Sequence, residues 1–324
     1  MENLAAKVKD IWEENKIEFE DRLDDWLKRL EEGEKLIRQA RSQFHQWDPL
    51  KVYVSVTRAK SKRRAVFSLR FFGQEVAELV VKDQSVVLKL TKRHRQNNMK
   101  WFQCTLDAGH YDWDGREAKK FRSYFKEKAF SSKREPKVRS PEHRVESKFI
   151  QEMLKGSGKF GVPGLKIQPV TIAGCPLQLP VPISASGKEL KEGDGHIDIL
   201  ARHRGKDGKT RLSVWELKRA GAYDHPASQA YIYAFTLLQI LRHPKNGPKW
   251  YRLFGYKSPI PKRIEIEAVV GITRNQERKF NKEKAEIEKN SPFEIAGDTF
   301  RMYAAYYEEK SDSIKFGQDP FREE

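Results

Sequence analysis

The sequence has few cysteines and no long apolar run. Only two of its 324 residues are cysteines, Cys104 and Cys175, and they lack metal-ligand spacing, so neither a disulfide framework nor a cysteine zinc site is expected. No run approaches the roughly 18 apolar residues of a membrane helix, and mean hydropathy is −0.78. The first residues lack the basic and apolar regions of a signal peptide. These absences predict a cytoplasmic protein without a membrane partner.

Positive charge is abundant but unevenly distributed, within a formal net charge of +17. Residues 1–50 carry 9 Lys/Arg and 13 Asp/Glu, whereas residues 51–140 carry 23 Lys/Arg and 9 Asp/Glu. Residues 141–324 carry 31 Lys/Arg and 24 Asp/Glu. Because proteins that bind nucleic acids gather basic side chains in one region, the middle segment predicts a nucleic-acid partner: DNA, with RNA as the alternative.

Hydrophobic patterns divide the chain into four parts. Residues 1–48 form an amphipathic helical segment, interrupted at Gly33, whose apolar stripe predicts either packing on its own domain or a homodimer contact. Residues 49–130 predict a basic β-rich domain with a closing helix near 115–128. Residues 131–139 form a linker to a domain over 140–324, in which residues 308–324 are expected to fray. The strands expected in the β-rich domain cover 52–56, 65–72, 75–81 and 85–90.

Two basic clusters lie between and after these strands. The side chains expected to bind nucleic acid are Arg58, Arg63, Arg64, Lys92, Arg93 and Arg95. A small basic sheet or barrel that holds a phosphate backbone fits this arrangement. The alternative is a set of loops whose charges only keep the protein soluble.

Charged residues inside two apolar runs indicate phosphodiester chemistry. Asp198 lies in a strand-like run over 195–200, and Glu216 and Lys218 lie in another over 212–218. Because side chains in a strand alternate, Glu216 and Lys218 share a face, and the hairpin signal Asp207-Gly208 would bring Asp198 beside them. Two carboxylates can hold Mg²⁺ or Mn²⁺, and a lysine can offset transition-state charge. A solvated strand face is the alternative, and Asp194 is an alternative ligand.

Two predicted helices add further candidates. Ser140-Pro141 is a helix start, and Glu146 follows at the edge of an apolar stripe. A second, almost wholly apolar helix begins at Pro226 and should be buried; Gln229 and Tyr233 share one of its faces. The alternatives are an exposed first-turn glutamate for Glu146 and ordinary packing for the other two.

Glu146, Gly195-x-x-Asp198, Glu216-x-Lys218 and Gln229-x-x-x-Tyr233 together resemble the PD-(D/E)xK nuclease superfamily. The last element resembles its RecB-like branch. The resemblance covers residues 140–275 and departs from the pattern where His196-Ile197 precedes Asp198 in place of the usual proline. It implies an α/β fold with a restriction-endonuclease-like mixed sheet flanked by helices, in the order helix, three strands, helix, strand. Residues 263–273 would supply the last strand.

The resemblance also implies an activity, that of a metal-dependent deoxyribonuclease. Asp198 and Glu216 would hold Mg²⁺ or Mn²⁺, with Glu146 as an accessory ligand or an acid that orients water, and Lys218 would be the electrostatic catalyst. Gln229 and Tyr233 would position the substrate strand or brace the site. The architecture resembles prokaryotic antiviral defence nucleases of the Shedu type, with DNA repair as another role. The alternatives are an RNA-cleaving nuclease and a catalytically inactive nucleic-acid-binding protein, against which the intact Asp, Glu and Lys argue.

Overall fold

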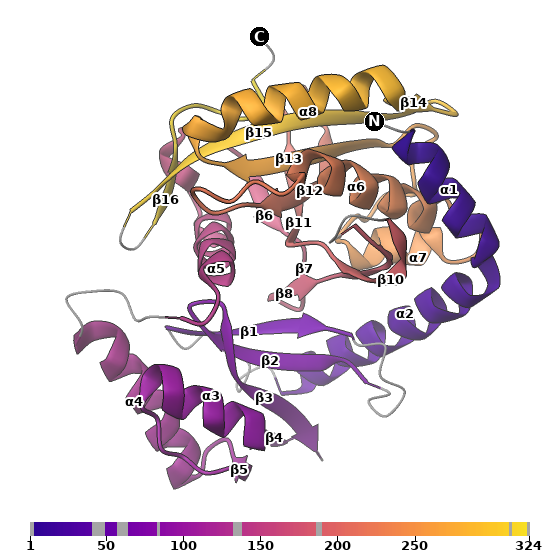
Figure 1. The fold of residues 1–324 in the computed structure, drawn as a ribbon. Coiled ribbons are helices and arrows are strands. Elements are labelled where there is room, and N and C mark those ends of the chain that lie inside the picture. The colour runs from indigo at the N-terminus through magenta and orange to yellow at the C-terminus, as the bar shows by residue number, and fades with distance from the viewer. Residues whose placement is uncertain are drawn as a thin grey trace.

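The chain forms an α/β fold with two large sheets and flanking helices (Figure 1). The computed structural model describes residues 3–40, 49–56, 64–82, 85–131, 138–185, 190–310 and 313–322. One sheet lies low in Figure 1 with helices α3 and α4, and the other lies above it with α6 and α8. None of the described helices is long and apolar enough to cross a membrane.

The first sheet begins as an antiparallel meander of strands rich in β-branched and aromatic residues, which favour a pleated, half-buried surface. Its four predicted strands are confirmed. Strand β8 extends the sheet by pairing in parallel with β1, although it comes from beyond residue 140. In spatial order the strands are β5 (Gly109–Asp112), β4 (Ser85–Leu90), β3 (Gln74–Lys82), β2 (Val66–Phe71), β1 (Leu50–Ser55), β8 (Cys175–Gln178) and β7 (Thr171–Ile172).

Two helices accompany this sheet. Helix α4 (Arg116–Ser131) confirms the predicted closing helix, and Phe121 and Phe125 are buried as expected. Helix α3 (Lys92–Phe102) was not predicted; Thr91 caps it and exchanges hydrogen bonds with His94. The second basic cluster therefore lies on the first turn of a helix, not in a loop.

The second sheet is mixed. Strands β11 and β12 form the predicted antiparallel hairpin, whereas β12, β13 and β15 run parallel. Parallel neighbours need crossover connections, and α6 (Pro226–Arg242) and α8 (Glu277–Asn290) lie in them. In spatial order the strands are β14 (Glu294–Ile295), β15 (Asp298–Glu309), β13 (Glu265–Ile272), β12 (Thr210–Leu217), β11 (Ile199–Arg204) and β6 (Ile167–Pro169), with β16 (Ile314–Phe316) beside β15.

Each face of the second sheet is covered by a helix whose apolar pattern matches its surroundings. Helix α5 (Pro141–Leu154), capped by Ser140, packs Phe149 against Trp215 on one face. Helix α6 contacts β12 and β13 on its own side and also α1, β9, α7 (Gly247–Leu253) and α8. Because α6 has neighbours on nearly every side, it is buried along almost its whole length, as its apolar sequence predicted.

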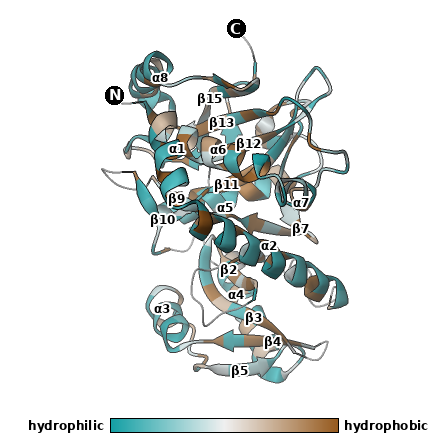
Figure 2. Cartoon of the chain, turned by 90° about the vertical axis from the view of Figure 1, so that its right-hand side faces the viewer, coloured by the Kyte–Doolittle hydropathy of each residue, from teal (hydrophilic) through white to brown (hydrophobic). Residues whose placement is uncertain are grey.

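The N-terminal helices α1 (Leu4–Glu14) and α2 (Lys16–Gln39) pack on the same chain. Their apolar stripe is buried, and α2 runs from the second sheet towards the first (Figure 1 and Figure 2). Arg22 Nη2 donates to Glu192 Oε1 at 2.9 Å, fixing α2 near β10. Packing on its own fold is therefore the alternative that the structure bears out, and nothing supports a homodimer through this stripe.

Three sequence expectations are corrected. Gly33 lies inside α2 and does not interrupt it; a Cβ there would stand 2.7 Å from Ala65 Cβ. Residues 195–200 are not one strand, because the chain breaks between β10 (Lys191–His196), which pairs with β9 (Pro180–Ser184), and β11. Residues 308–324 do not simply fray, since β16 pairs with β15. The division of the chain at 131–139 stays a prediction, but the first sheet crosses it.

Candidate active site

All six predicted catalytic residues line one cavity of about 220 Å³. It lies between the start of α5, the break before β11, the end of β12 and the start of α6. The lining comprises Glu142, His143, Glu146, His196, Asp198, Glu216, Leu217, Lys218, Gln229 and Tyr233. Chain segments separated by up to about ninety residues thus bring their polar side chains to one place. Asp194, the alternative ligand, is exposed on β10 and is not part of this lining.

The strand register places Asp198 and Glu216 side by side. Ile199 pairs with Trp215, so the residue before Ile199 lies opposite Glu216. Asp198 Oδ2 accepts a hydrogen bond from the Leu217 N–H at 2.8 Å, which anchors its carboxylate beside the end of β12. Lys218 Nζ donates to Glu216 Oε1 at 2.9 Å, as expected for residues two apart on one face.

Glu146 meets this group from α5 and is bound by two residues of the first sheet. Gln178 Nε2 on β8 donates to Glu146 Oε1 at 2.9 Å. Arg70 on β2 donates to Gln178 Oε1 at 2.5 Å and places Nη1 3.9 Å from Glu146 Oε1. The first sheet therefore forms part of the site. Neither Arg70 nor Gln178 was predicted, because no local pattern distinguishes them from other strand residues.

Burial dominates the electrostatics of the acidic groups. It raises the pKa of Glu146 to about 7 against the opposing Arg70 guanidinium, and the pKa of Asp198 to about 6 against the Leu217 N–H. The pKa of Glu216 is raised well above its usual value by burial and by Asp198. Burial lowers the pKa of Lys218, but the carboxylates of Glu216 and Asp198 outweigh it and raise that pKa overall. Such shifts are typical of functional sites.

Gln229 and Tyr233 hold the end of β9 against the cavity. Gln229 Nε2 donates to the Ala185 carbonyl at 3.1 Å, and the Ala185 N–H donates to Tyr233 Oη at 3.3 Å. Both side chains thus bind one backbone unit, as bracing residues would. Gln229 Oε1 is buried without a hydrogen-bond partner.

The donor set fits a hard divalent cation. Glu216 Oε2 is buried and has no hydrogen-bond partner, and carboxylate oxygens are the ligands that Mg²⁺ and Mn²⁺ prefer. Within the described part of the chain, however, Glu146, Asp198 and Glu216 are not a set whose ligand oxygens all lie within 4.8 Å. Because the oxygens of these three acids are too far apart, joint ligation by all three requires side-chain rotation.

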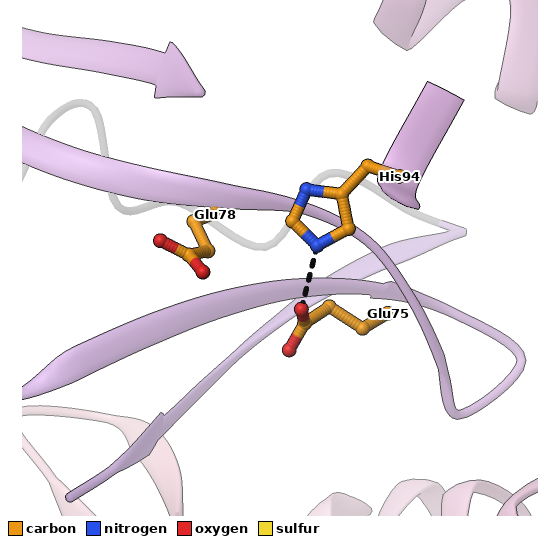
Figure 3. A group of neighbouring side chains, drawn as sticks. All are labelled: Glu75, Glu78 and His94. Carbon is orange, nitrogen blue, oxygen red and sulfur yellow. Dashed lines mark hydrogen bonds and ion pairs between the residues drawn. The ribbon is translucent and has the colours of Figure 1, made fainter. Parts of the chain in front are cut away.

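A different set in the described residues does meet that spacing: Glu75, Glu78 and His94 (Figure 3). The Thr91 N–H donates to His94 Nδ1 at 3.2 Å, so the ring proton belongs on Nε2, which lies 2.7 Å from Glu75 Oε1. Lys89 Nζ also donates to Glu78 Oε2 at 3.1 Å. The cluster is therefore explained as a helix cap, a hydrogen bond between His94 and Glu75, and an ion pair between Lys89 and Glu78.

The predicted nucleic-acid-binding residues are found apart from this cavity. Arg64 precedes β2, while Lys92, Arg93 and Arg95 lie on the first turn of α3, and all four are exposed. Arg95 is paired with Asp107 at 2.7 Å. Arg58 and Arg63 lie outside the described residues.

No protein-family model, curated protein or solved structure matches the chain.

Replacing Asp198 by asparagine is expected to stabilise the metal-free protein at pH 8. Burial raises the folded-state pKa of Asp198 to about 6, so the folded protein binds the extra proton, and stability falls as pH rises from about 4 through 6. The half-buried asparagine keeps the acceptor for the Leu217 N–H but carries no charge. We expect the free energy of unfolding to rise by about 1–2 kcal/mol, in the lower part of the range that such a pKa shift allows.

Denaturant unfolding of wild type, Asp198→Asn and the control Asp194→Asn in EDTA, at pH 5 and pH 8, measures this gain. It should appear at pH 8, shrink at pH 5 and be absent from the exposed control. A destabilised Asp198→Asn at pH 8 would contradict the assigned burial cost.

Proposed function

We propose that the chain is a metal-dependent deoxyribonuclease with a PD-(D/E)xK active site. The observation that carries the proposal is the grouping of Asp198, Glu216 and Lys218 at one end of the β11–β12 hairpin, with Glu146 facing them from α5. Phosphodiester hydrolysis needs a site for cations, a proton acceptor and a positive charge near the leaving or bridging oxygens. These side chains supply all three.

The order of elements around the cavity supports a restriction-endonuclease-like core. Helix α5, strands β6, β11 and β12, helix α6 and strand β13 come in the order helix, three strands, helix, strand, with the short helix α7 between α6 and β13. The four strands are consecutive neighbours in the second sheet. Strands β7 to β10 are an insertion between the first and second strands of this core.

The residues of the chain take distinct roles in this proposal. Asp198, Glu216 and Glu146 would hold Mg²⁺ or Mn²⁺, which supplies charge stabilisation at the phosphate and a lowered pKa for bound water. Where Glu146 does not ligate the cation, its pKa near 7 suits it to accept a proton from the attacking water at neutral pH. Lys218 places its ammonium where negative charge develops, and Gln229 and Tyr233 keep the cavity wall in position.

Incubation with plasmid, linear duplex, single-stranded DNA and RNA, each with and without Mg²⁺, tests the function directly. Cleavage of at least one DNA substrate that requires the cation supports the proposal. Cleavage of RNA alone would favour the ribonuclease alternative. Tight DNA binding without cleavage of any substrate would favour the inactive binding protein. A role in antiviral defence or in DNA repair stays a prediction.

The exposed basic residues give a separate prediction. If they hold the DNA backbone, a triple Arg64→Ala, Lys92→Ala, Arg93→Ala variant should bind all duplex sequences more weakly. Each lost phosphate contact should also reduce the log–log salt slope by about 0.9. Fluorescence anisotropy of two unrelated duplexes over a salt series measures both quantities.

The matched control for this variant is Lys289→Ala, an exposed lysine on α8. Unchanged affinity and slope in the triple variant would mean that these charges serve solubility and that DNA binds on another surface.

A further inference from the structure

A second cavity, of about 840 Å³, lies at the other end of the β11–β12 hairpin. Arg211 near the start of β12 lines it, whereas Glu216 near the end of β12 lines the candidate active site. Five residues of strand separate these two side chains, or about 16 Å. Because alternate residues face opposite sides, Arg211 is on the α5 face of the sheet with Trp215, and Glu216 is on the α6 face. The two cavities are therefore separate sites.

The floor of this cavity is a buried polar pair. His203 and Glu267 are 6% and 1% exposed, and His203 Nδ1 lies 2.9 and 3.1 Å from the two carboxylate oxygens of Glu267. Burial raises the pKa of Glu267, against the favourable contact with His203. Such a pair costs desolvation free energy that an apolar floor would avoid. Its presence beneath a large opening indicates a surface built for a polar ligand.

The wall of the cavity is aromatic. Phe321 stacks on the His203 ring with centroids 3.7 Å apart and planes 13° apart. Tyr303 meets Phe321 edge to face, with centroids 5.3 Å apart. Both rings are half-buried, so part of each faces the opening. A further planar ring could extend this stack at little conformational cost.

The rim is strongly basic. Among the residues that the structure describes, six lysines and arginines line the cavity against three carboxylates: Lys166, Arg204, Lys206, Arg211, Arg301 and Arg322 against Asp207, Glu267 and Asp319. Asp207 is bound by Arg211 and Glu267 by His203, and Glu265 beside the lining is bound by Arg211 and lies 4.0 Å from Arg301. The remaining positive charge favours an anion, and guanidinium groups bind phosphate oxygens in pairs.

We propose that this cavity binds a nucleoside phosphate. The base would stack on the Phe321 and Tyr303 wall, and the phosphates would lie on Arg204 and Arg301 at the rim. The volume is within the range of small-molecule sites. An inorganic anion would use the rim alone and leave the aromatic wall without a function. A base joined to a phosphate is found both in a free nucleotide and in the terminal nucleotide of a nucleic-acid strand, so either could bind here. The proposal does not rest on nuclease activity.

The test is a titration of the full-length protein with a fluorescent N-methylanthraniloyl derivative of ADP, in EDTA. Saturable binding is expected, with Kd raised at least about tenfold in Arg204→Ala and in Arg301→Ala. Exposed Lys289→Ala is the matched control and should bind as wild type, as should Glu216→Ala, which alters only the other cavity. Because Arg204 is exposed on a strand end, its variant should fold, and thermal melting verifies this.

Competition distinguishes the sources of the ligand. Displacement by unlabelled ADP supports a free nucleotide as the ligand. Displacement only by a 5′-phosphorylated decanucleotide supports the end of a nucleic-acid strand, and either result supports the proposed site. Pyrophosphate that competes as well as ADP would overturn the base-stacking assignment. No saturable binding up to millimolar probe, or binding lost in Glu216→Ala but kept in both arginine variants, would overturn the proposal.

Discussion

Alanine at Asp198, Glu216 or Lys218 is expected to lower the rate of DNA cleavage by at least about 100-fold each, the scale seen when one charge-stabilising group is removed from an active site. The two carboxylates lie side by side at the hairpin end, and the Lys218 ammonium is 2.9 Å from Glu216. Loss of either carboxylate removes one of the two acids that lie side by side. Loss of Lys218 removes the ammonium of the cavity, since no other described residue of its lining is a lysine.

The variants should fold and bind DNA nearly as the wild type does, because the side chains lie at a cavity and not in the apolar core. Single-turnover cleavage, anisotropy with duplex DNA and thermal melting separate chemistry, binding and folding. Lys209→Ala is the control: Lys209 directly precedes β12, at the end away from the cavity, and its side chain is 68% exposed. Full activity in all three purified variants would refute the assigned site.

Removal of divalent cations is expected to stop cleavage completely. EDTA should abolish it, Mg²⁺ or Mn²⁺ should restore it, and Ca²⁺ should bind without supporting turnover. Binding has a second readout, because a ligand that prefers the folded state raises the melting temperature. Mg²⁺ should therefore stabilise the wild type and leave Glu216→Ala unchanged.

Two results would contradict the metal-dependent mechanism. Undiminished hydrolysis in chelator would show that the carboxylates do not act through a cation. An equal rise in melting temperature for wild type and Glu216→Ala would show that Mg²⁺ binds elsewhere. Because the melting measurement needs neither a substrate nor activity, it tests the metal site even if none of the substrates is cleaved.

The candidate site was predictable where its signals are local. Strand alternation joined Glu216 to Lys218, the Asp207-Gly208 turn set the hairpin, and helical spacing joined Gln229 to Tyr233. Arg70 and Gln178 were not predictable in this way. They reach Glu146 only because β8 pairs with β1, and a contact between elements more than a hundred residues apart leaves no local pattern.

The elements missed by sequence patterns have physical reasons. Strands β6, β8 and β9 are short and contain Pro169, Pro176 and Pro180, and proline removes a ladder donor and argues against a strand. Helix α3 begins with basic residues that disfavour a helix N-terminus, but the Thr91 cap and His94 compensate. The chain breaks before Asp198, although the surrounding apolar residues resemble one continuous strand.

The pairing of β8 with β1 means that the candidate active site depends on both sheets. A fragment that starts at residue 140 would keep every acid of the cavity but leave one edge of β8 without its neighbour and Glu146 without Arg70. Gly73, in the turn between β2 and β3, lies so close to α5 that a Cβ would stand 1.9 Å from the His143 carbonyl oxygen. Truncation, domain exchange and fusion near residue 140 would all disturb the candidate site, so engineering has to retain both sheets.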